Sequence, residues 1–214
     1  MNRMRTQITN FNGWFWPNTG EHTYKVLSAQ NSYKDILLPL CSKTDTMVQA
    51  GGNCGIIVYP FCEHFKNIYT FEPNSLNFLC LNMNLDLENV HKFQACLGSE
   101  RKQISLENQF THHNGDNGAF NVAKTPGNIP VMRLDDLNLQ SCDLVMLDVE
   151  GYEQEALNGA LETIKKFKPV LCLEMEPQWL ARYGATVDSV MKIVTDLNYI
   201  PYGKYHADII FVQK

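Results

Sequence analysis

Three acidic side chains follow short apolar runs in this sequence, and their positions indicate a ligand site. Glu72 follows the run 67–71, and Asp148 and Glu150 follow the run 144–147. Carboxylates fit poorly in a hydrophobic core, but they fit the carboxyl edge of a parallel sheet, where open α/β folds bind ligands. There a carboxylate accepts hydrogen bonds from hydroxyl groups or removes a proton from a substrate.

A glycine-rich turn comes about twenty residues before the first of these acids, a distance typical of nucleoside-binding folds. The apolar segment 46–50 leads into Gly51-Gly52-Asn53-Cys54-Gly55. Glycine lets the backbone approach a ligand closely, because no Cβ stands in the way. A strand, such a turn and an acid at the end of the next strand form a nucleoside-binding unit. The acid, here Glu72, accepts hydrogen bonds from ribose hydroxyls.

The spacing of the glycines distinguishes between two nucleoside cofactors, a nicotinamide dinucleotide and S-adenosylmethionine. A nicotinamide dinucleotide site needs Gly-x-Gly-x-x-Gly, and the glycines at 51, 52 and 55 do not meet that register. An NAD-dependent oxidoreductase is therefore disfavoured. The spacing Gly51-x-x-x-Gly55 instead resembles the first motif of class I S-adenosylmethionine-dependent methyltransferases, whose cofactor has no pyrophosphate.

Strand and helix patterns alternate along the rest of the chain, which indicates an α/β fold. We expect strands over 46–50, 67–71, 90–95, 142–147 and 169–174, helices over 32–40, 55–64, 74–83, 155–166 and 187–197, a short strand over 103–106 and a final pair at 199–200 and 208–212. Pro60 should kink or interrupt its helix. No repeat or linker divides the chain. We therefore expect one domain over 1–214, with residues 1–45 as an N-terminal cap or lid and 46–214 as the cofactor-binding core.

Two further segments are candidates for ligand contact. Residues 11–22 hold two tryptophans, and Trp16 lies either in an apolar lid or in a strand and turn that seals one edge of the sheet. Residues 111–118 form a polar loop with paired histidines, including His113. A metal site and a solvated surface loop are the alternatives there, and we predict no metal, because no carboxylate stands at ligand spacing.

The composition of the chain disfavours some classes of binding partner. A net charge of −5 argues against broad binding to nucleic acid, and no run approaches the about eighteen apolar residues that span a membrane. Seven scattered cysteines without a Cys-x-x-Cys pair suit free thiols in a reducing cytoplasm. We expect a cytoplasmic protein that acts on a small molecule or glycan.

Four motifs together resemble the FkbM-type methyltransferases, a class I S-adenosylmethionine-dependent family. They are Val48–Gly55, Phe71–Asn74, Leu134–Leu137 and Leu147–Glu153, the last followed by Leu157-x-Gly159-Ala160. The resemblance runs over roughly 46–176. It implies a three-layer Rossmann-like fold whose mostly parallel seven-stranded sheet ends in an antiparallel strand. It also implies S-adenosyl-L-methionine as cofactor and methyl transfer to a hydroxyl of a sugar, glycan or metabolite.

The cofactor-binding candidates fall into groups by the part of the cofactor that each is expected to meet. The methionine part is expected at Gln49, Gly51, Asn53 and Gly55, the ribose at Glu72, and the adenine at Pro73, Asn74, Ala95 and Cys96. For Ala95 and Cys96, buried packing is an equal alternative.

The residues expected to contact the methyl acceptor belong mainly to the second group of acids, after the run 144–147. Asp148 and Glu150 are expected to face the acceptor, and either could act as the base; the alternative for Glu150 is to cap the following helix. Glu174, which ends another strand, either joins Asp148 at a divalent cation or forms a salt bridge. Further acceptor-side candidates are Tyr152, Glu153, His113 and Trp16.

The chain departs from the family at two positions. The family generally has an acid where Gln49 stands, and commonly a lysine where Met146 stands. Gln49 can accept a hydrogen bond from the methionine ammonium, but a bond between two charged groups is stronger. A second hypothesis follows: a catalytically degenerate protein of the methyltransferase fold with a binding or regulatory role.

Overall fold

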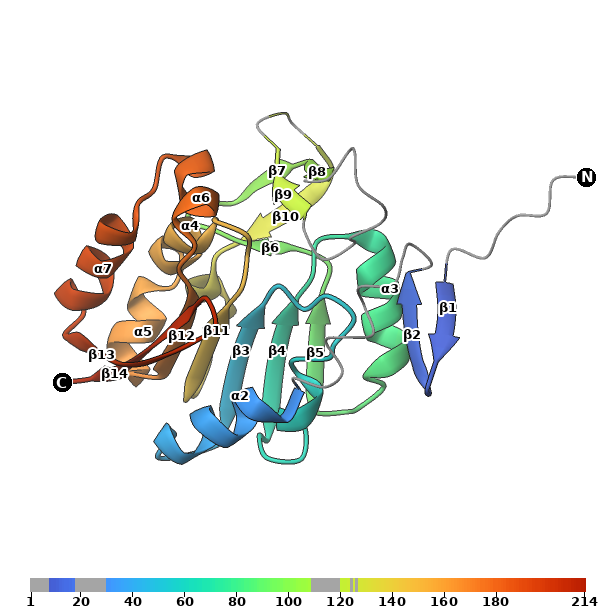
Figure 1. The fold of residues 1–214 in the computed structure, drawn as a ribbon, viewed down its shortest axis with the longest axis horizontal. Helices are drawn as coiled ribbons and strands as arrows, with labels where there is room; N and C mark the ends of the chain where they lie inside the picture. The colour runs from blue at the N-terminus through green and yellow to red at the C-terminus, as the bar shows by residue number, and fades with distance from the viewer. Residues whose placement is uncertain (1–7, 18–29, 109–119, 124, 126) are drawn as a thin grey trace, which may run out of the picture.

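The computed structural model describes residues 8–17, 30–108, 120–123, 125 and 127–214. A seven-stranded sheet lies at the centre, in the order β13-β14-β12-β11-β3-β4-β5 (Figure 1). Its strands are β3 (Thr46–Ala50), β4 (Asn67–Phe71), β5 (Val90–Phe93), β11 (Leu144–Leu147), β12 (Val170–Glu174), β13 (Tyr199–Tyr205) and β14 (Asp208–Gln213). Only β14 runs against its neighbours β12 and β13. The predicted mostly parallel α/β sheet with an antiparallel last strand is confirmed.

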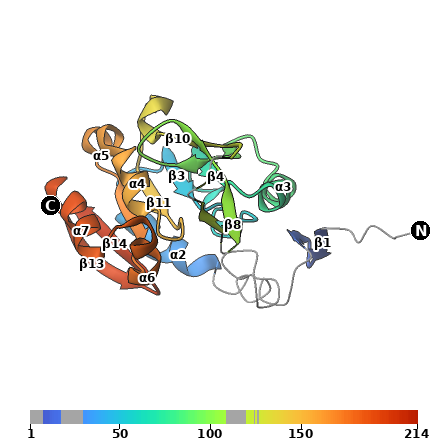
Figure 2. The same cartoon turned by 90° about the horizontal axis from the view of Figure 1, so that it is seen from above.

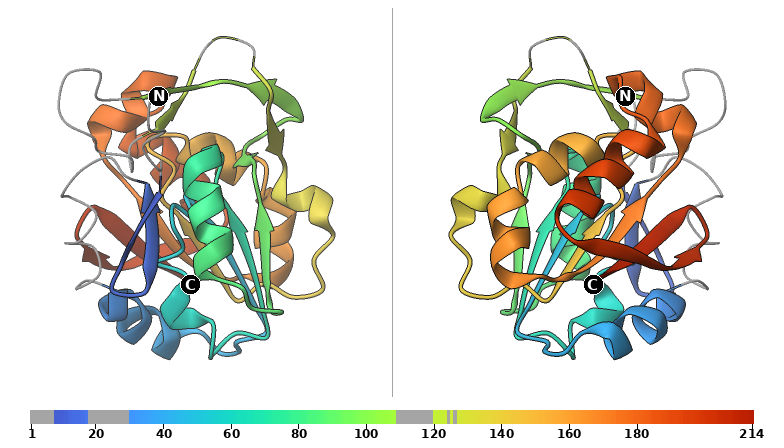
Figure 3. Two further views of the ribbon diagram at one scale, coloured as in Figure 1. Left: turned by 90° about the vertical axis from the view of Figure 1, so that its right-hand side faces the viewer. Right: turned by 90° about the vertical axis from the view of Figure 1, so that its left-hand side faces the viewer.

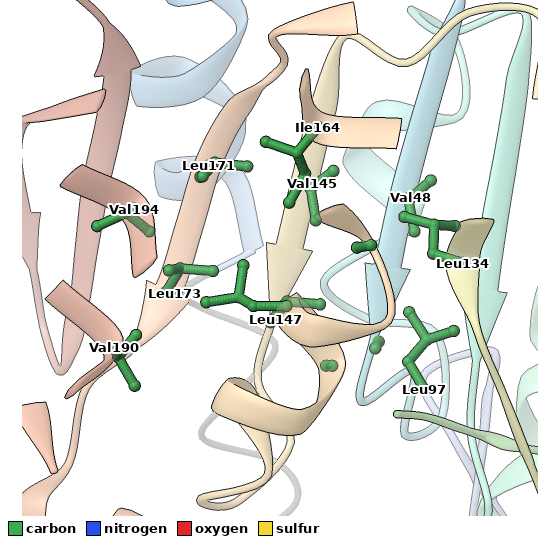
Figure 4. Close-up of a cluster of buried hydrophobic side chains, with 14 of the residues drawn as sticks. Val48, Leu97, Leu134, Val145, Leu147, Ile164, Leu171, Leu173, Val190 and Val194 are labelled. Atoms are coloured by element: carbon green, nitrogen blue, oxygen red, sulfur yellow. The ribbon is translucent and has the colours of Figure 1, made fainter. Parts of the chain in front are cut away.

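Helices cover both faces of this sheet, as parallel strands require. The α-helices are α2 (Gln30–Leu37), α3 (Ser75–Asn84), α4 (Glu153–Asn158), α5 (Leu161–Phe167), α6 (Pro177–Leu180) and α7 (Val187–Asp196). On one face Val145 and Leu171 pack in a cluster with Ile164 of α5 and Val194 of α7 (Figure 4). On the other face, Met146 belongs to a cluster with residues of α2. Central strands are therefore buried on both sides, which explains their continuous apolar sequences.

Three smaller sheets complete the structure. Their strands are β1 (Ile8–Phe11) with β2 (Trp14–Pro17), β6 (Cys96–Leu97) with β10 (Ile129–Met132) and β7 (Lys102–Ile104), and β8 (Leu106–Asn108) with β9 (Phe120–Val122). Strands β6 to β10 stand above the carboxyl ends of β3 and β4 (Figures 2 and 3). They form a wall beside the edge where the acids were predicted.

Several predicted elements are confirmed and two are wrong. The helix expected over 74–83 forms as α3, with the Asn74 side chain accepting hydrogen bonds from the backbone N–H groups of Leu76 and Asn77, both at 3.0 Å. No helix runs over 55–64: that segment is a series of turns around the 3₁₀ helix η2 (Tyr59–Phe61). Gly55 there has a φ of 91°, outside the helical region, and Pro60 cannot donate a backbone hydrogen bond.

The predicted helix over 155–166 is in fact two helices, α4 and α5, that separate at Gly159. A Cβ on Gly159 would lie 1.9 Å from the carbonyl oxygen of Gly98. Two chain segments therefore pass so closely that only glycine fits, and the helix bends at this point.

The N-terminal aromatic segment forms a strand and turn where it is described. Trp16 in β2 is 2% exposed and belongs to a buried cluster with Cys54 and Cys80. Of the two alternatives for residues 11–17, packing is the one observed. None of the helices in the described part of the chain is long and apolar enough to cross a membrane.

Candidate active site

A hollow of about 510 Å³, its open mouth included, lies at the carboxyl edge of β3, β4 and β11. Its walls come from the glycine turn, the ends of the central strands and the small strands above them. The lining residues are Ala50, Gly51, Phe71, Glu72, Pro73, Ala95, Cys96, Leu97, Leu106, Val122, Asp148, Val149, Glu150 and Tyr152. Eight of the predicted site residues therefore meet at one place: Gly51, Glu72, Pro73, Ala95, Cys96, Asp148, Glu150 and Tyr152.

The glycine turn is shaped by two close approaches. The backbone N–H groups of Gly51 and Gly52 both donate to the carbonyl oxygen of Phe71, at 3.0 and 2.8 Å. Gly51 has a φ of 89°, and a Cβ there would lie 1.8 Å from the carbonyl oxygen of Asp148. Because a side chain would separate β3 from the loop after β11, glycine is needed here to form the floor of the hollow.

Glu72 is held in the floor by backbone hydrogen bonds. Its Oε2 accepts from the backbone N–H of Asn53 and its Oε1 from that of Asn74, each at 2.7 Å. The side chain is 5% exposed, and burial raises the pKa of Glu72 to about 7, against the opposing effect of these donors. The side chain of Asn77 is a third donor to this carboxylate. Two carboxylate oxygens offer about four acceptor positions, so one remains for a ligand hydroxyl. Asn53 and Asn74 thus orient the acid rather than line the hollow.

The wall beyond Glu72 is apolar. Pro73 follows β4, and Ala95 and Cys96 follow the neighbouring strand β5; the last two are only 1% and 8% exposed. Leu106 and Val122 of the β8–β9 pair add apolar surface. A slot with apolar walls next to a hydroxyl-binding acid suits a flat heterocycle joined to a ribose.

The acids after β11 sit in a strained loop. Glu150 has a φ of 56° and Gly151 a φ of 99°. A Cβ on Gly151 would lie 2.3 Å from the carbonyl oxygen of Trp179, so the loop passes directly under α6. A left-handed non-glycine residue such as Glu150 costs free energy and is often found at functional sites.

Glu153 supports this loop from inside the protein. Its Oε1 accepts from the backbone N–H groups of Val149 and Gly151, at 3.0 and 3.3 Å, and its side chain is 1% exposed. It does not line the hollow, which corrects the expectation of an acceptor contact: its carboxylate positions Glu150 instead. The N-cap position of α4 belongs to Tyr152, so Glu150 does not occupy the capping position that was its alternative role.

Burial and the charge of Glu150 hold the pKa of Asp148 well above its usual range. Burial together with the charge of Asp148 raises the pKa of Glu174 to about 10. Neither alternative predicted for Glu174 is found within the described residues: its Oε2 is buried without a hydrogen-bond partner, and no group of three or more metal-ligating side chains occurs there.

The remaining predicted residues lie away from the hollow or outside the described chain. Gln49 is 1% exposed beneath the turn, Gly55 lies against Leu85, and Trp16 is packed in the N-terminal cluster. Trp16 is thus a packing residue. His113 lies outside the described residues.

Six lining residues were not among the predicted site residues: Ala50, Phe71, Leu97, Leu106, Val122 and Val149. Leu106 and Val122 reach the site because β8 pairs with β9 across a gap of more than ten residues. Nothing in their local sequence distinguishes them from other apolar residues in small strands.

The sequence model of the Methyltransferase FkbM domain matches residues 50–201. The chain belongs to this family. No curated protein sequence matches the chain. Among solved structures, the FkbM methyltransferase from Methylobacillus flagellatus KT is similar, with a TM-score of 0.50 and 16% identity. That similarity covers 78% of this chain and only 43% of the Methylobacillus chain, so this protein spans less than half of that relative.

Two other structures extend the fold comparison of this FkbM-family protein. Trm5b from Pyrococcus abyssi has a TM-score of 0.51 and 10% identity over 96% of this chain and 55% of its own. A Streptococcus mutans structure in complex with SAH has a TM-score of 0.50 and 9% identity, and the match covers 85% of this chain and 94% of that one. At these identities the likeness shows the fold. The family match and the fold therefore agree.

Proposed function

We propose that this protein transfers a methyl group from S-adenosyl-L-methionine to a hydroxyl of a sugar, glycan or small metabolite. The observation that carries the proposal is the Glu72 carboxylate, fixed by two backbone donors in the floor of the hollow. Its position between a glycine turn and an apolar slot suits the ribose of a nucleoside cofactor. The turn at Gly51 would take the methionine part, with Asn53 holding Glu72 beside it, and Pro73 with Ala95 and Cys96 would flank the adenine.

The reaction needs alignment, exclusion of water and a proton acceptor. As the acceptor oxygen bonds to the methyl carbon, the carbon–sulfur bond breaks and its electron pair stays on sulfur. The hydroxyl proton then has to leave, and Asp148 and Glu150 are the carboxylates in the hollow that could take it. In its ionised form, a carboxylate whose pKa is raised, as that of Asp148 is, is a stronger base than an exposed one. The apolar walls reduce competition from water.

The two departures from the family pattern lie next to each other. Met146 pairs in register with Gln49 on the neighbouring strand, so both side chains face the same side of the sheet. If relatives carry an acid and a lysine there, this chain replaces both partners together. Replacing a whole buried pair with neutral groups is often tolerated, whereas removing one partner is costly. The joint change is therefore no sign of a damaged fold, and it does not by itself favour the degenerate alternative.

Calorimetric titration with S-adenosyl-L-methionine tests the proposal. We expect saturable binding at one site, and Glu72→Ala should raise the Kd at least about tenfold, because hydrogen bonds to a charged group are lost. Glu88→Ala, at an exposed site between α3 and β5, is the control and should leave the Kd unchanged. A wild-type protein that does not bind the cofactor would overturn the proposal.

A degenerate protein remains distinguishable from an enzyme once binding is established. Transfer of an isotopically labelled methyl group to any acceptor shows an enzyme. Binding of the cofactor without transfer across a panel of hydroxylated sugars and metabolites supports the degenerate alternative. Asp148→Asn and Glu150→Gln then identify the base, since only loss of the proton acceptor lowers kcat without weakening cofactor binding.

A further inference from the structure

A second hollow shares two wall residues with the hollow beside Glu72. Its volume is about 640 Å³, its open mouth included. The lining residues are Lys102, Gln103, Ile104, Val122, Ala123, Thr125, Tyr152 and Tyr183. Val122 and Tyr152 line both hollows, so the two cavities are neighbours.

Two tyrosines form a fixed wall of the second hollow. The rings of Tyr152 and Tyr183 meet edge to face, with 5.0 Å between their centroids, which is a favourable geometry for aromatic pairs. The hydroxyl of Tyr183 donates to the carbonyl oxygen of Val122, at 3.2 Å. This bond connects β9 to the 3₁₀ helix η4 (Ala181–Tyr183). The wall is therefore built by segments that are far apart in the sequence and held together by packing and a hydrogen bond.

The second hollow differs in charge from the hollow beside Glu72. Its described lining includes the ammonium group of Lys102 and no aspartate or glutamate. The hollow beside Glu72 is lined by three acids and, among the described residues, by no lysine or arginine. A concave site with a positive charge attracts anions. The two neighbouring hollows are therefore suited to different parts of one molecule.

Lys102 keeps a hydrogen-bond donor for such an anion. Its Nζ donates to Oε1 of Glu100, at 2.8 Å, and to the hydroxyl of Tyr152. An ammonium group has three donors, so one remains. The side chains of Lys102 and Glu100 are 38% and 65% exposed, and an ion pair exposed to this degree contributes little. A ligand anion can therefore join Glu100 at Lys102 or replace it at low cost.

The hydroxyl of Tyr152 supplies a second donor. Burial raises the pKa of Tyr152 against the opposing effect of Lys102, so the phenol keeps its proton at neutral pH. The phenolic oxygen accepts from Lys102, and its own proton remains for another acceptor. An ammonium and a hydroxyl donor side by side suit a carboxylate or a phosphate, which has at least two acceptor oxygens. Because Tyr152 lines both hollows, an anion bound there lies next to the proposed site of methyl transfer.

We propose that the methyl acceptor carries an anionic group, a carboxylate or a phosphate, that binds to Lys102 and the Tyr152 hydroxyl in the second hollow. Sugar acids, sugar phosphates and hydroxy acids are the chemical class. The hydroxyl to be methylated extends past Tyr152 into the hollow beside Glu72, which Asp148 and Glu150 line. This inference rests on the proposed function, because it names the substrate class of the same enzyme.

Three sugars with the same ring separate the charge of the ligand from its shape: glucose, glucuronic acid and glucose-6-phosphate. Each is titrated at about neutral pH into protein saturated with S-adenosylhomocysteine, with ligand-observed NMR as the readout. We expect at least one of the two acids to bind about tenfold more tightly than glucose, because hydrogen bonds to charged groups are the stronger ones. The tighter of the two acids distinguishes a carboxylate from a phosphate as the anionic group. If neither acid binds more tightly than glucose, the inference is overturned.

Two lysine variants assign the preference to the second hollow. Lys102→Met keeps an unbranched side chain but removes the charge, and it should abolish the preference for the acids. Lys192→Met is the matched control, because Lys192 also belongs to an exposed ion pair, with Asp196 at 2.7 Å, and lies on α7 outside both hollows. The control should retain the preference. If Lys102→Met does not fold, the wild-type sugar series still decides, because it involves no substitution.

Glu100→Gln tests the competition for Lys102. Removing the carboxylate that pairs with Lys102 should strengthen binding of the acids by up to about fivefold, the contribution of an exposed ion pair, and leave binding of glucose unchanged. A purely structural role of the ion pair predicts no such gain. Weaker binding of the acids to Glu100→Gln would contradict the assignment to Lys102.

Binding of S-adenosylhomocysteine to the same samples separates the two proposals. If the wild type does not bind it, the proposed function fails, and the sugar series without it still tests the anion site. If the wild type binds it but shows no preference for the acids, the proposed function stands and this inference alone is wrong.

Discussion

The side-chain carbonyl of Gln49 accepts a hydrogen bond of 2.7 Å from the hydroxyl of Thr70 on the neighbouring strand. The two residues are 1% and 0% exposed. The amide nitrogen of Gln49 also donates to the carbonyl oxygen of Ala50, at 3.2 Å. Both ends of the amide therefore have partners inside the sheet, and the residue that departs from the family pattern is part of a satisfied buried network. Its predicted contact with the cofactor stays a prediction.

Breaking this network should destabilise the protein. Gln49→Leu leaves the Thr70 hydroxyl buried without its acceptor, and we expect the free energy of unfolding to fall by about 1–3 kcal/mol. Thr70→Val should have a similar effect. The double variant should cost less than the sum of the two, because neither polar group is then left unpaired. Urea denaturation measures all four proteins, and strict additivity would contradict the network.

Two glycines with positive φ provide a matched test of the loop under α6. Gly151→Ala places a Cβ 2.3 Å from the carbonyl oxygen of Trp179, whereas Gly184→Ala, with a φ of 76°, meets nothing within 4 Å. Gly184→Ala should cost about 1–2 kcal/mol, the strain of a left-handed residue. Gly151→Ala should cost clearly more and weaken cofactor binding, since the loop carries Asp148 and Glu150. Similar losses of stability in both variants would contradict the observed close packing.

The stability of the cofactor-free protein should fall as the pH rises. Burial raises the pKa values of Glu72 and Glu153 to about 7 from 4.5. Because the folded state holds these protons more tightly than the unfolded state, the stability they contribute is complete below about pH 4.5 and is lost as the pH rises through about 7. The urea midpoint should therefore decrease between about pH 4.5 and 7. Glu153→Gln should flatten that decrease, and an increase would contradict the direction of the shifts.

Cofactor affinity should follow the opposite trend. The ribose hydroxyls donate to an ionised Glu72, so binding should strengthen as the pH rises through about 7 and Glu72 loses its proton. Titration calorimetry with S-adenosylhomocysteine across this range measures the effect. Glu72→Gln should bind more weakly and lose the pH dependence. A wild-type affinity that is constant with pH would argue against Glu72 as the ribose ligand.

The parts of the site that were predictable share a physical reason. Gly51 and Glu72 stand where the sequence changes from apolar strand to turn, and the carboxyl ends of parallel strands must meet at one edge. The place of Glu150 in the hollow was predictable for the same reason, because it also follows an apolar strand. The structure adds that Glu153, three residues on, holds the loop in place through two backbone N–H groups, which spacing alone does not reveal.

Other features depend on distant contacts that local sequence does not encode. Asp208 lies beside Glu174 only because β14 pairs antiparallel with β12, more than thirty residues away. The prediction of a helix over 55–64 was wrong for a local reason, because Gly55 has a positive φ and Pro60 lacks a backbone N–H. The break at Gly159 depends on the approach of Gly98, again a tertiary contact.

The central claim is that the hollow beside Glu72 holds S-adenosylmethionine, and a crystal structure of the protein with S-adenosylhomocysteine tests it most directly. We predict the ribose hydroxyls within hydrogen-bond distance of the Glu72 carboxylate, with the adenine between Pro73 and Cys96. The sulfur should face Asp148 and Glu150. A nucleoside bound elsewhere, or a hollow that stays empty at saturating ligand, would contradict the account.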